Sequence, residues 1–343
     1  MMVDMTERRV DSRTEADEAQ LDRAVGTVLA SAAGDALGSQ YEFGPALPNS
    51  MTPAFGVGYF GHAAGEWTDD TSMAVPILNR LASGETLEDP LAFAEIVAEW
   101  RGWARTAKDV GVQTRGILAL LSDDADEHAA RVASESAHRR SGRSGGNGSL
   151  MRTGPVALGY LDRSPDELVI AAGRVAQLTH WEVDNVDACA LWCLAIRHAV
   201  RTGELDMRAQ LSAVPSERRA RWAGLVDAAT APGVHPRNFQ ADNGWVVRAF
   251  QAALAAVAGA ASLQDALERA VRGGGDTDTV AAIAGSLAGA VWGASALPAT
   301  YTQNLHGWPG IDAAHLADLA RRAVRHGRGD ERKPSPDAPA TAQ

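Results

Sequence analysis

The chain has 343 residues, 45% of them hydrophobic, and a formal net charge of -11. Its length allows one large hydrophobic core, while its acidic balance argues against binding to the phosphate backbone, so no nucleic-acid partner is expected. No apolar stretch reaches the roughly 18 residues of a membrane-spanning helix, and the N-terminus lacks the apolar segment of a secretory signal. We therefore expect no membrane association and a cytoplasmic location.

Hydrophobic residues recur at helical spacing between the two ends, and they are mainly Ala and Leu rather than the residues typical of strands. The sequence predicts an all-α fold, a compact single-domain multi-helix globule over residues 19–326. Residues 1–18 and 327–343 are polar without apolar periodicity and are expected to be flexible tails. In chain order, the predicted helices cover residues 21–37, 72–82, 91–105, 113–121, 166–178, 185–201, 245–260, 263–272, 279–292 and 313–326.

The first predicted helix carries small residues on one face, at Ala24, Gly26, Ala30 and Gly34. Small residues allow the axis of a neighbouring helix to approach closely. The only two cysteines lie four residues apart in the apolar stretch 185–201, a spacing more consistent with buried reduced thiols than with a disulfide framework. We assign them no chemical role.

Two acidic clusters precede predicted helices, Thr68-Asp69-Asp70 and Asp276-Thr277-Asp278-Thr279. Taken singly, each is better explained as a helix N-cap. Capping uses one side-chain oxygen, however, and two carboxylates in each cluster leave surplus negative charge that a hard cation would balance. Oxygen ligands favour Mg²⁺ or Mn²⁺ over zinc. The sequence alone does not show whether the two clusters lie close together in the folded protein.

Five segments, in this order, resemble the ADP-ribosylglycohydrolase family. They are GDALGSQYEF (34–43), EWTDDTSMA (66–74), GNGSLMR (146–152), TH (179–180) and GGGDTDTVAAIAG (273–285). The resemblance spans residues 21 to 295 and implies an all-helical protein with two Mg²⁺ or Mn²⁺ ions. It implies a hydrolase that cleaves the glycosidic bond at the distal ribose and releases ADP-ribose from a protein or small molecule.

The acceptor that the resemblance slightly favours is an arginine side chain. Serine-linked ADP-ribose and O-acetyl-ADP-ribose are alternatives for the same site. A hydrolase of another nucleoside glycoside and a non-catalytic ADP-ribose-binding protein are further alternatives, although all six metal-ligand positions are filled.

The resemblance assigns a role to particular residues of this chain. The implied metal ligands are Thr68, Asp69, Asp70, Asp276, Asp278 and Thr279. Catalysis is assigned to Glu42 together with Asp69 and Asp70, with Glu42 activating water while the cations hold the ribose diol. The residues implied to bind the phosphates and ribose are Ser144, Asn147, Gly148, Ser149 and His180.

Some positions remain open or depart from the family pattern. Asp35 matches the family's Gly-Asp pair and has either a direct or a supporting role. Ser144 stands where one branch has an aspartate proposed to act in catalysis, which moves that role to Glu42. Gly145 replaces an adenine-stacking aromatic, and Trp245 either covers the base or packs in the core. Arg152 is either a structural residue or a substrate contact.

Overall fold

The computed structural model describes residues 3–328, with side chains from Asp17 onward. Within this part the all-α prediction is confirmed, because helices account for nearly all regular structure and the only sheet is a pair of two-residue strands. None of the described helices is both long and apolar enough to cross a membrane. The predicted C-terminal tail lies outside the described residues, except for Gly327 and Arg328.

The helices and strands follow one another along the chain in a fixed order. They are α1 (Val3–Gly38), α2 (Asp69–Ala82), α3 (Pro90–Ala104), α4 (Val112–Leu118), α5 (Glu127–Ser141), η1 (Asn147–Ser149), α6 (Val156–Gly159), α7 (Pro165–Gln177), α8 (Val183–Thr202), η2 (Arg208–Ala213), α9 (Ser216–Thr230), η3 (Pro236–Phe239), α10 (Val246–Ala258), α11 (Leu263–Arg272), α12 (Thr277–Trp292), η4 (Ala294–Ala296), α13 (Ala299–Thr302), β1 (His306–Gly307), β2 (Ile311–Asp312) and α14 (Ala313–Gly327).

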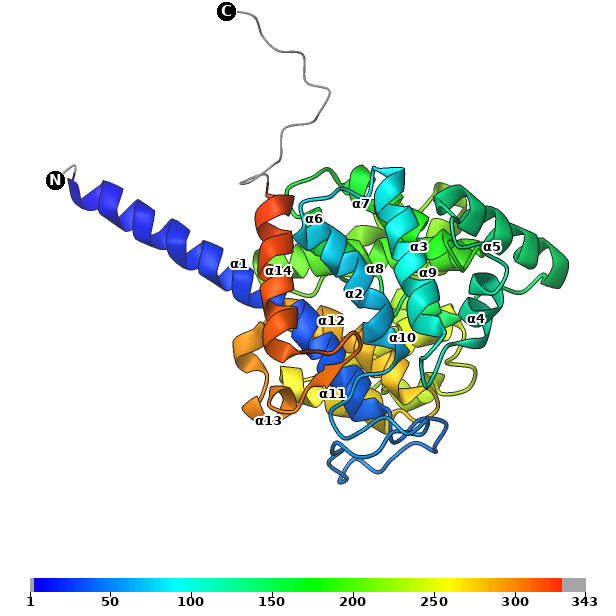
Figure 1. Ribbon diagram of the computed structural model, residues 1–343. Coiled ribbons are helices and arrows are strands. Elements are labelled where there is room, and N and C mark those ends of the chain that lie inside the picture. The colour runs from blue at the N-terminus through cyan, green and yellow to red at the C-terminus, as the bar shows by residue number, and fades with distance from the viewer. Residues whose placement is uncertain (1–2, 329–343) are drawn as a thin grey trace, which may run out of the picture.

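Helices α1 and α12 form the centre of the molecule and pack against each other with their backbones almost in contact (Figure 1). A Cβ added at Gly34 would lie 2.3 Å from the carbonyl oxygen of Ala281, and one added at Gly289 would lie 2.0 Å from that of Gly26. The small residues predicted to allow close approach do so. Because Gly26 meets Gly289 and Gly34 meets Ala281, the two helices are antiparallel. The end of α1 therefore lies beside the start of α12.

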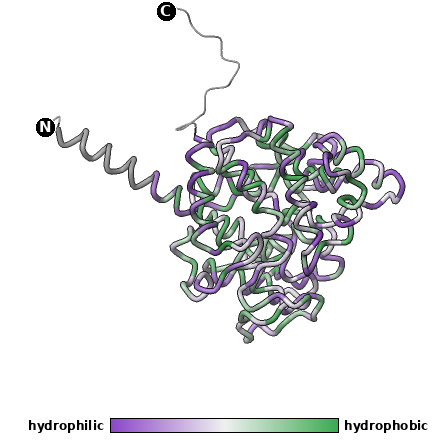
Figure 2. Tube along the Cα trace, in the orientation of Figure 1, coloured by the Kyte–Doolittle hydropathy of each residue, from purple (hydrophilic) through white to green (hydrophobic). Residues whose placement is uncertain are grey.

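The remaining helices surround this pair. Helices α2 and α14 contact each other and α1, while α8, α10 and α11 pack against α12. Helix α8 supplies a nearly continuous buried surface that includes both cysteines, which are reduced. The polar helix α5 lies at one edge of the molecule, where Figure 2 shows a largely hydrophilic segment.

Several predicted boundaries differ from the structure. Helices α5 and α9 were not predicted, because each buries only three residues and therefore carries a weak apolar pattern. Helix α1 begins at Val3, in the segment predicted as an N-terminal tail, and the domain boundaries stay a prediction. Helices α2 and α12 begin earlier than predicted, so the acidic clusters occupy their first turns rather than the preceding loops.

Candidate active site

The packing of α1 on α12 brings the two acidic clusters together. Gly38, at the end of α1, is in backbone contact with Asp278, and its carbonyl accepts a hydrogen bond from the Thr277 hydroxyl at 2.8 Å. Oxygen atoms of Asp35, Asp70 and Asp278 lie within 4.8 Å of one another. Carboxylates more than two hundred residues apart in the chain therefore share one buried volume.

A second group of acids adjoins the first through Asp278. Oxygen atoms of Glu42, Asp276 and Asp278 also lie within 4.8 Å of one another. Glu42 is only 8% exposed although it lies in the turn after α1. Asp278 thus stands between two sets of carboxylate oxygens, an arrangement that can hold more than one cation.

Asp35 has a distinct place in this cluster, because the protein itself saturates both of its oxygens. The main-chain N–H and hydroxyl of Thr68 donate to Oδ1 at 2.9 and 2.8 Å. The same two groups of Thr71 donate to Oδ2 at 3.0 and 2.6 Å. Four donors occupy the lone pairs of the carboxylate, so Asp35 is suited to holding the start of α2 in place.

The first turn of α2 presents its acids without using them as caps. The Thr68 side chain makes no capping hydrogen bond, and Asp69 accepts the Gly111 N–H at 3.1 Å through Oδ2. Asp70 Oδ2 lies 3.0 Å from the Thr68 hydroxyl oxygen. The single proton of that hydroxyl serves the shorter bond, to Asp35. Asp70 Oδ1 is buried with no hydrogen-bond partner among the described residues. An unpartnered buried carboxylate oxygen fits a cation better than it fits a helix cap.

Glycines shape the start of α12. Gly274 and Gly275 have φ values of 77° and 76°, which favour glycine. Asn243 fastens this turn, accepting the Asp276 N–H at 3.0 Å and donating to the Gly274 carbonyl at 3.0 Å. The Asp276 side chain makes no cap on α12, so its carboxylate is available to the site. Thr279, 6% exposed, lines the same cavity.

Burial and mutual repulsion change the acidity of these groups in the metal-free chain. Burial raises the pKa of Asp69 to about 8, with Asp109 and Asp35 adding to the rise. Burial, followed by the charge of Asp276, raises the pKa of Glu42 to about 9. Burial also raises the pKa of Asp70 and of Asp278 well above the ordinary value. The cluster therefore retains protons at neutral pH unless cations replace them.

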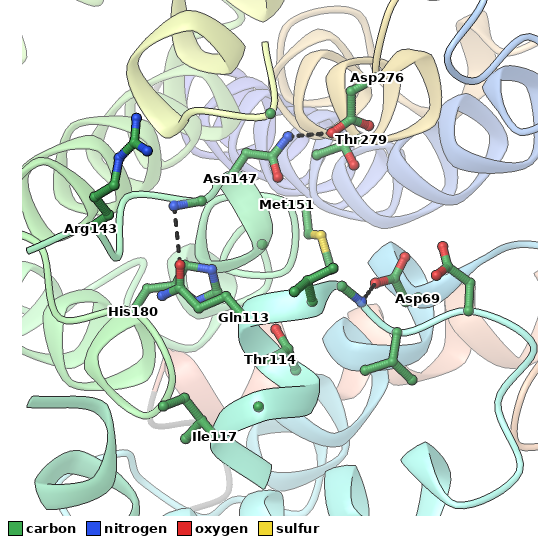
Figure 3. A pocket seen from close by; sticks show the side chains of 18 of the residues that line it. Asp69, Gln113, Thr114, Ile117, Arg143, Asn147, Met151, His180, Asp276 and Thr279 are labelled. Atoms are coloured by element: carbon green, nitrogen blue, oxygen red, sulfur yellow. Dashed lines mark hydrogen bonds between the residues drawn. The ribbon is translucent and has the colours of Figure 1, made fainter. Parts of the chain in front are cut away.

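The cluster lies at one end of a cavity of about 910 Å³. Figure 3 shows Asp69, Asp276 and Thr279 toward one side of this cavity, with Arg143 and His180 toward the other. Arg140 lines the cavity as well. The cavity thus has an acidic part and a basic part, which suits an elongated ligand that carries hydroxyls and negative charge.

The glycine-rich segment forms the wall between these parts. Asn147 and Gly148 line the cavity, and the Asn147 amide donates to Asp276 Oδ2 at 2.7 Å (Figure 3). The Ser149 hydroxyl is fully buried and accepts from the Asn185 amide at 2.7 Å. The Ser144 hydroxyl pairs with His138 Nδ1 at 2.7 Å. Of these four residues, only Asn147 and Gly148 line the cavity.

The hydrogen bonds around His180 favour one tautomer of its ring. Buried Arg152 donates to the Thr179 hydroxyl at 2.7 Å, and the proton of that hydroxyl can then be donated to His180 Nδ1, 2.7 Å away. This arrangement favours a ring proton on Nε2, next to Gly146. Burial and Arg152 hold the pKa of His180 well below its usual range, so the ring is a neutral donor. Arg152 itself stacks on Trp100 at 4.2 Å and has a structural role.

Trp245 is not a core residue, because its side chain is 36% exposed. It lines a second cavity of about 650 Å³ together with Gly145 and Glu182. This cavity shares Arg143 and Gly146 with the first. A Cβ at Gly145 would lie 2.8 Å from the Glu182 carboxylate, so Glu182 occupies the space beside this glycine.

The prediction from sequence missed Asp109. This residue lies in the loop before α4 and lines the cavity with Glu42 and Asp69. Burial raises its pKa, and Asp276 adds to the rise. A lone aspartate in the stretch Lys108-Asp109-Val110-Gly111 offered no pattern to identify it.

Comparison with known proteins agrees with this geometry. The family model described as ADP-ribosylglycohydrolase matches residues 16–333. ADP-ribosylarginine hydrolase Tri1 of Pseudomonas putida (strain GB-1) is 29% identical over 309 residues, covering 89% of this chain and 78% of the relative. ADP-ribosyl-[dinitrogen reductase] glycohydrolase of Rhodospirillum rubrum is 28% identical over 295 residues, covering 83% and 90%.

A solved structure, titled ADP-ribosylglycohydrolase-related protein complex, superposes with a TM-score of 0.67 at 26% identity. The superposition covers 90% of this chain and 99% of that structure. The family-model match over residues 16–333 includes both acidic clusters.

Proposed function

The chain belongs to the ADP-ribosylglycohydrolase family, and on that basis we propose that it hydrolyses the bond between ADP-ribose and a modified arginine side chain. The observation that carries the proposal is the meeting of the two acidic clusters in one cavity beside a basic region. The names of the relatives, ADP-ribosylarginine hydrolase among them, support arginine as the acceptor. The substrate is accordingly an ADP-ribose-bearing protein or small molecule.

The proposed cofactors are two divalent cations, Mg²⁺ or Mn²⁺, at the acidic end of the cavity. The unpartnered oxygen of Asp70 and the all-oxygen character of the cluster support this choice. Such cations supply positive charge that holds ribose hydroxyls and offsets the repulsion between the carboxylates. The proposed ligands are Thr68, Asp69, Asp70, Asp276, Asp278 and Thr279.

Glu42 is the proposed general base. Water attacks the anomeric carbon of the distal ribose, Glu42 accepts a proton from that water, and the bond from carbon to the guanidine nitrogen breaks with its electron pair leaving on nitrogen. We propose that Asp109, which lines the same cavity, returns a proton to the departing guanidine. The burial of Glu42 keeps bulk water away from this step.

The remainder of the ligand occupies the basic part of the cavity. We assign the diphosphate to Arg143, Gly148 and the Nε2–H donor of His180, since charged and neutral donors converge there. Ser144 and Ser149 contribute through the shape of the loop. The adjoining second cavity, beside the exposed ring of Trp245, is the proposed place of the base.

The test is an assay of cleavage with three substrates, ADP-ribosylated arginine, an ADP-ribosylserine peptide and O-acetyl-ADP-ribose, with and without Mg²⁺ or Mn²⁺. We expect metal-dependent release of ADP-ribose from arginine. Asp69→Asn and Asp70→Asn should abolish turnover while the fold persists. Asp166→Asn, which changes an exposed aspartate in the first turn of α7, is the matched control. Full activity in either cluster variant refutes the metal-dependent mechanism.

A further inference from the structure

Three aromatic side chains cluster at the mouth of the active-site cavity. The ring of Phe43 meets Tyr59 at 5.1 Å and Phe60 at 6.2 Å between centroids, both edge to face. Phe43 and Phe60 line the cavity, next to Glu42. Phe43 is 61% exposed and Tyr59 63% exposed. Large rings gathered at the entrance of a polar site, and not buried in the core, indicate a contact surface for a ligand.

The backbone holds Phe43 at this entrance at an energetic cost. Its φ of 60° is in the left-handed region, which among the described non-glycine residues only Asp242 shares. The Phe43 N–H donates to the Gly275 carbonyl at 2.7 Å, and the Gly275 N–H donates back to Gly44 at 2.9 Å. These bonds tie the turn to the loop that carries Asp276. A bulky residue kept in a strained conformation beside a reaction centre is characteristic of functional contacts.

The surroundings of the Phe43 ring favour a flat cation. Glu42 precedes it in the chain, and Asp109 lines the same cavity, so carboxyl groups that can accept hydrogen bonds lie near the ring. A guanidinium group combines a planar apolar surface with a positive charge, and it stacks on aromatic faces while pairing with carboxylates. A serine hydroxyl and an acetyl group carry no positive charge, and so lack this combination. The entrance thus combines the two features that recognise an arginine side chain.

We propose that Phe43, supported by Phe60, contacts the guanidinium of the acceptor arginine and thereby makes the enzyme selective for cationic acceptors. This inference rests on the proposed function and names the element of the site that selects among acceptors. In this proposal Phe43 contacts the leaving group, the acceptor arginine, and does not contact ADP-ribose. Tyr59 packs against the edge of Phe43 without lining the cavity, so it lies outside the contact.

The experiment compares Phe43→Leu and Phe43→Trp with Tyr59→Leu, which makes the same kind of change one ring away. For ADP-ribosylated arginine, Phe43→Leu should raise KM about fivefold with little change in kcat, while Phe43→Trp keeps the wild-type KM. Tyr59→Leu should change KM less than twofold. Binding of free ADP-ribose, measured by calorimetry with Mn²⁺ present, should stay within about twofold in all three variants, because ADP-ribose lacks the acceptor.

Different results overturn different conclusions. An unchanged KM in Phe43→Leu, or an equal loss of ADP-ribose binding, overturns the assignment of Phe43 to the acceptor. A Phe43→Trp variant as impaired as Phe43→Leu also overturns it, because the aromatic face would then not be what matters. A wild-type protein that binds ADP-ribose but cleaves no ADP-ribosylated arginine overturns the proposed function instead.

Discussion

Asparagine replacements at Asp35 and at Asp70 are expected to change the stability of the metal-free protein in opposite directions. Both residues are buried, and their oxygens lie within 4.8 Å of each other and of Asp278. They differ in hydrogen bonding, since Asp35 accepts four bonds while one oxygen of Asp70 has no partner among the described residues. The same chemical change therefore tests two different roles.

At Asp35, the new amide group faces donors that need an acceptor. A threonine hydroxyl can rotate and accept from the amide, but the main-chain N–H beside it cannot. One buried N–H is left unpaired and a charge-assisted acceptor is lost, which costs about 2–4 kcal/mol. We expect Asp35→Asn to lower the Tm by roughly 3–6 °C.

At Asp70, the replacement removes one negative charge from a crowded cluster. Two unit charges about 4.8 Å apart at an effective dielectric constant of about 20 repel by about 3.5 kcal/mol. Partial protonation of the metal-free cluster reduces this gain. Asp70→Asn should therefore raise the stability by between zero and about 3 kcal/mol, while abolishing the stabilisation that added Mn²⁺ gives the wild type.

The assay is thermal unfolding in EDTA at neutral pH, followed by titration with Mn²⁺, with exposed Asp166→Asn as the control. Asp35→Asn should begin at a lower Tm and still respond to Mn²⁺, and Asp70→Asn should begin at or above the wild-type Tm and not respond. If Asp35→Asn is neutral, or if Asp70→Asn is the destabilised variant, the division between a supporting Asp35 and a ligand Asp70 is wrong.

Four further predictions follow from other parts of the site. Phe43→Gly should be about 1 kcal/mol more stable than Phe43→Ala in denaturant unfolding, because glycine adopts the positive φ without strain; the reverse order would mean that the turn is relaxed. Asn147→Ala should weaken Mn²⁺ binding about tenfold in calorimetry, since its amide orients Asp276. Arg143→Ala should weaken ADP-ribose binding about tenfold or more and leave kcat nearly unchanged if the arginine holds phosphate. In EDTA the Tm should fall as the pH rises from about 4 to about 8. Over this range Asp69, with its raised pKa, keeps a proton in the folded protein that the unfolded chain has already released. Saturating Mn²⁺ should remove this dependence of the Tm on pH.

The proposed acceptor contact, Phe43, and the proposed general base, Glu42, come from one short turn. Glu42 and Phe43 are neighbours in the chain, and the Phe43 N–H bonds to the loop before Asp276. A change that moves the backbone of this turn would therefore affect both catalysis and acceptor choice, whereas Phe43→Leu should change acceptor binding alone. Calorimetry with ADP-ribose shows whether a variant has also disturbed the ADP-ribose site, and kcat and KM then separate the two effects.

Much of the site could be predicted because its chemistry is local. A run such as Thr68-Asp69-Asp70 contains more carboxylates than a helix start needs, and Gly274 with Gly275 indicates a turn with positive φ. Asp109 and Phe43 could not be predicted in the same way. Each is a single residue of a common type, and its importance comes only from neighbours supplied by distant segments.

Periodicity, composition and side-chain chemistry are properties of short segments, so the helical fold, the two acidic clusters and the small residues that line α1 could all be predicted from the sequence. The folded chain was needed to show that the end of α1 meets the start of α12. This meeting places Asp70 and Asp278 in one volume, while threonines saturate Asp35. The physical reason is that proximity between clusters depends on how closely the α1 and α12 backbones pack, and this contact joins residues more than two hundred positions apart.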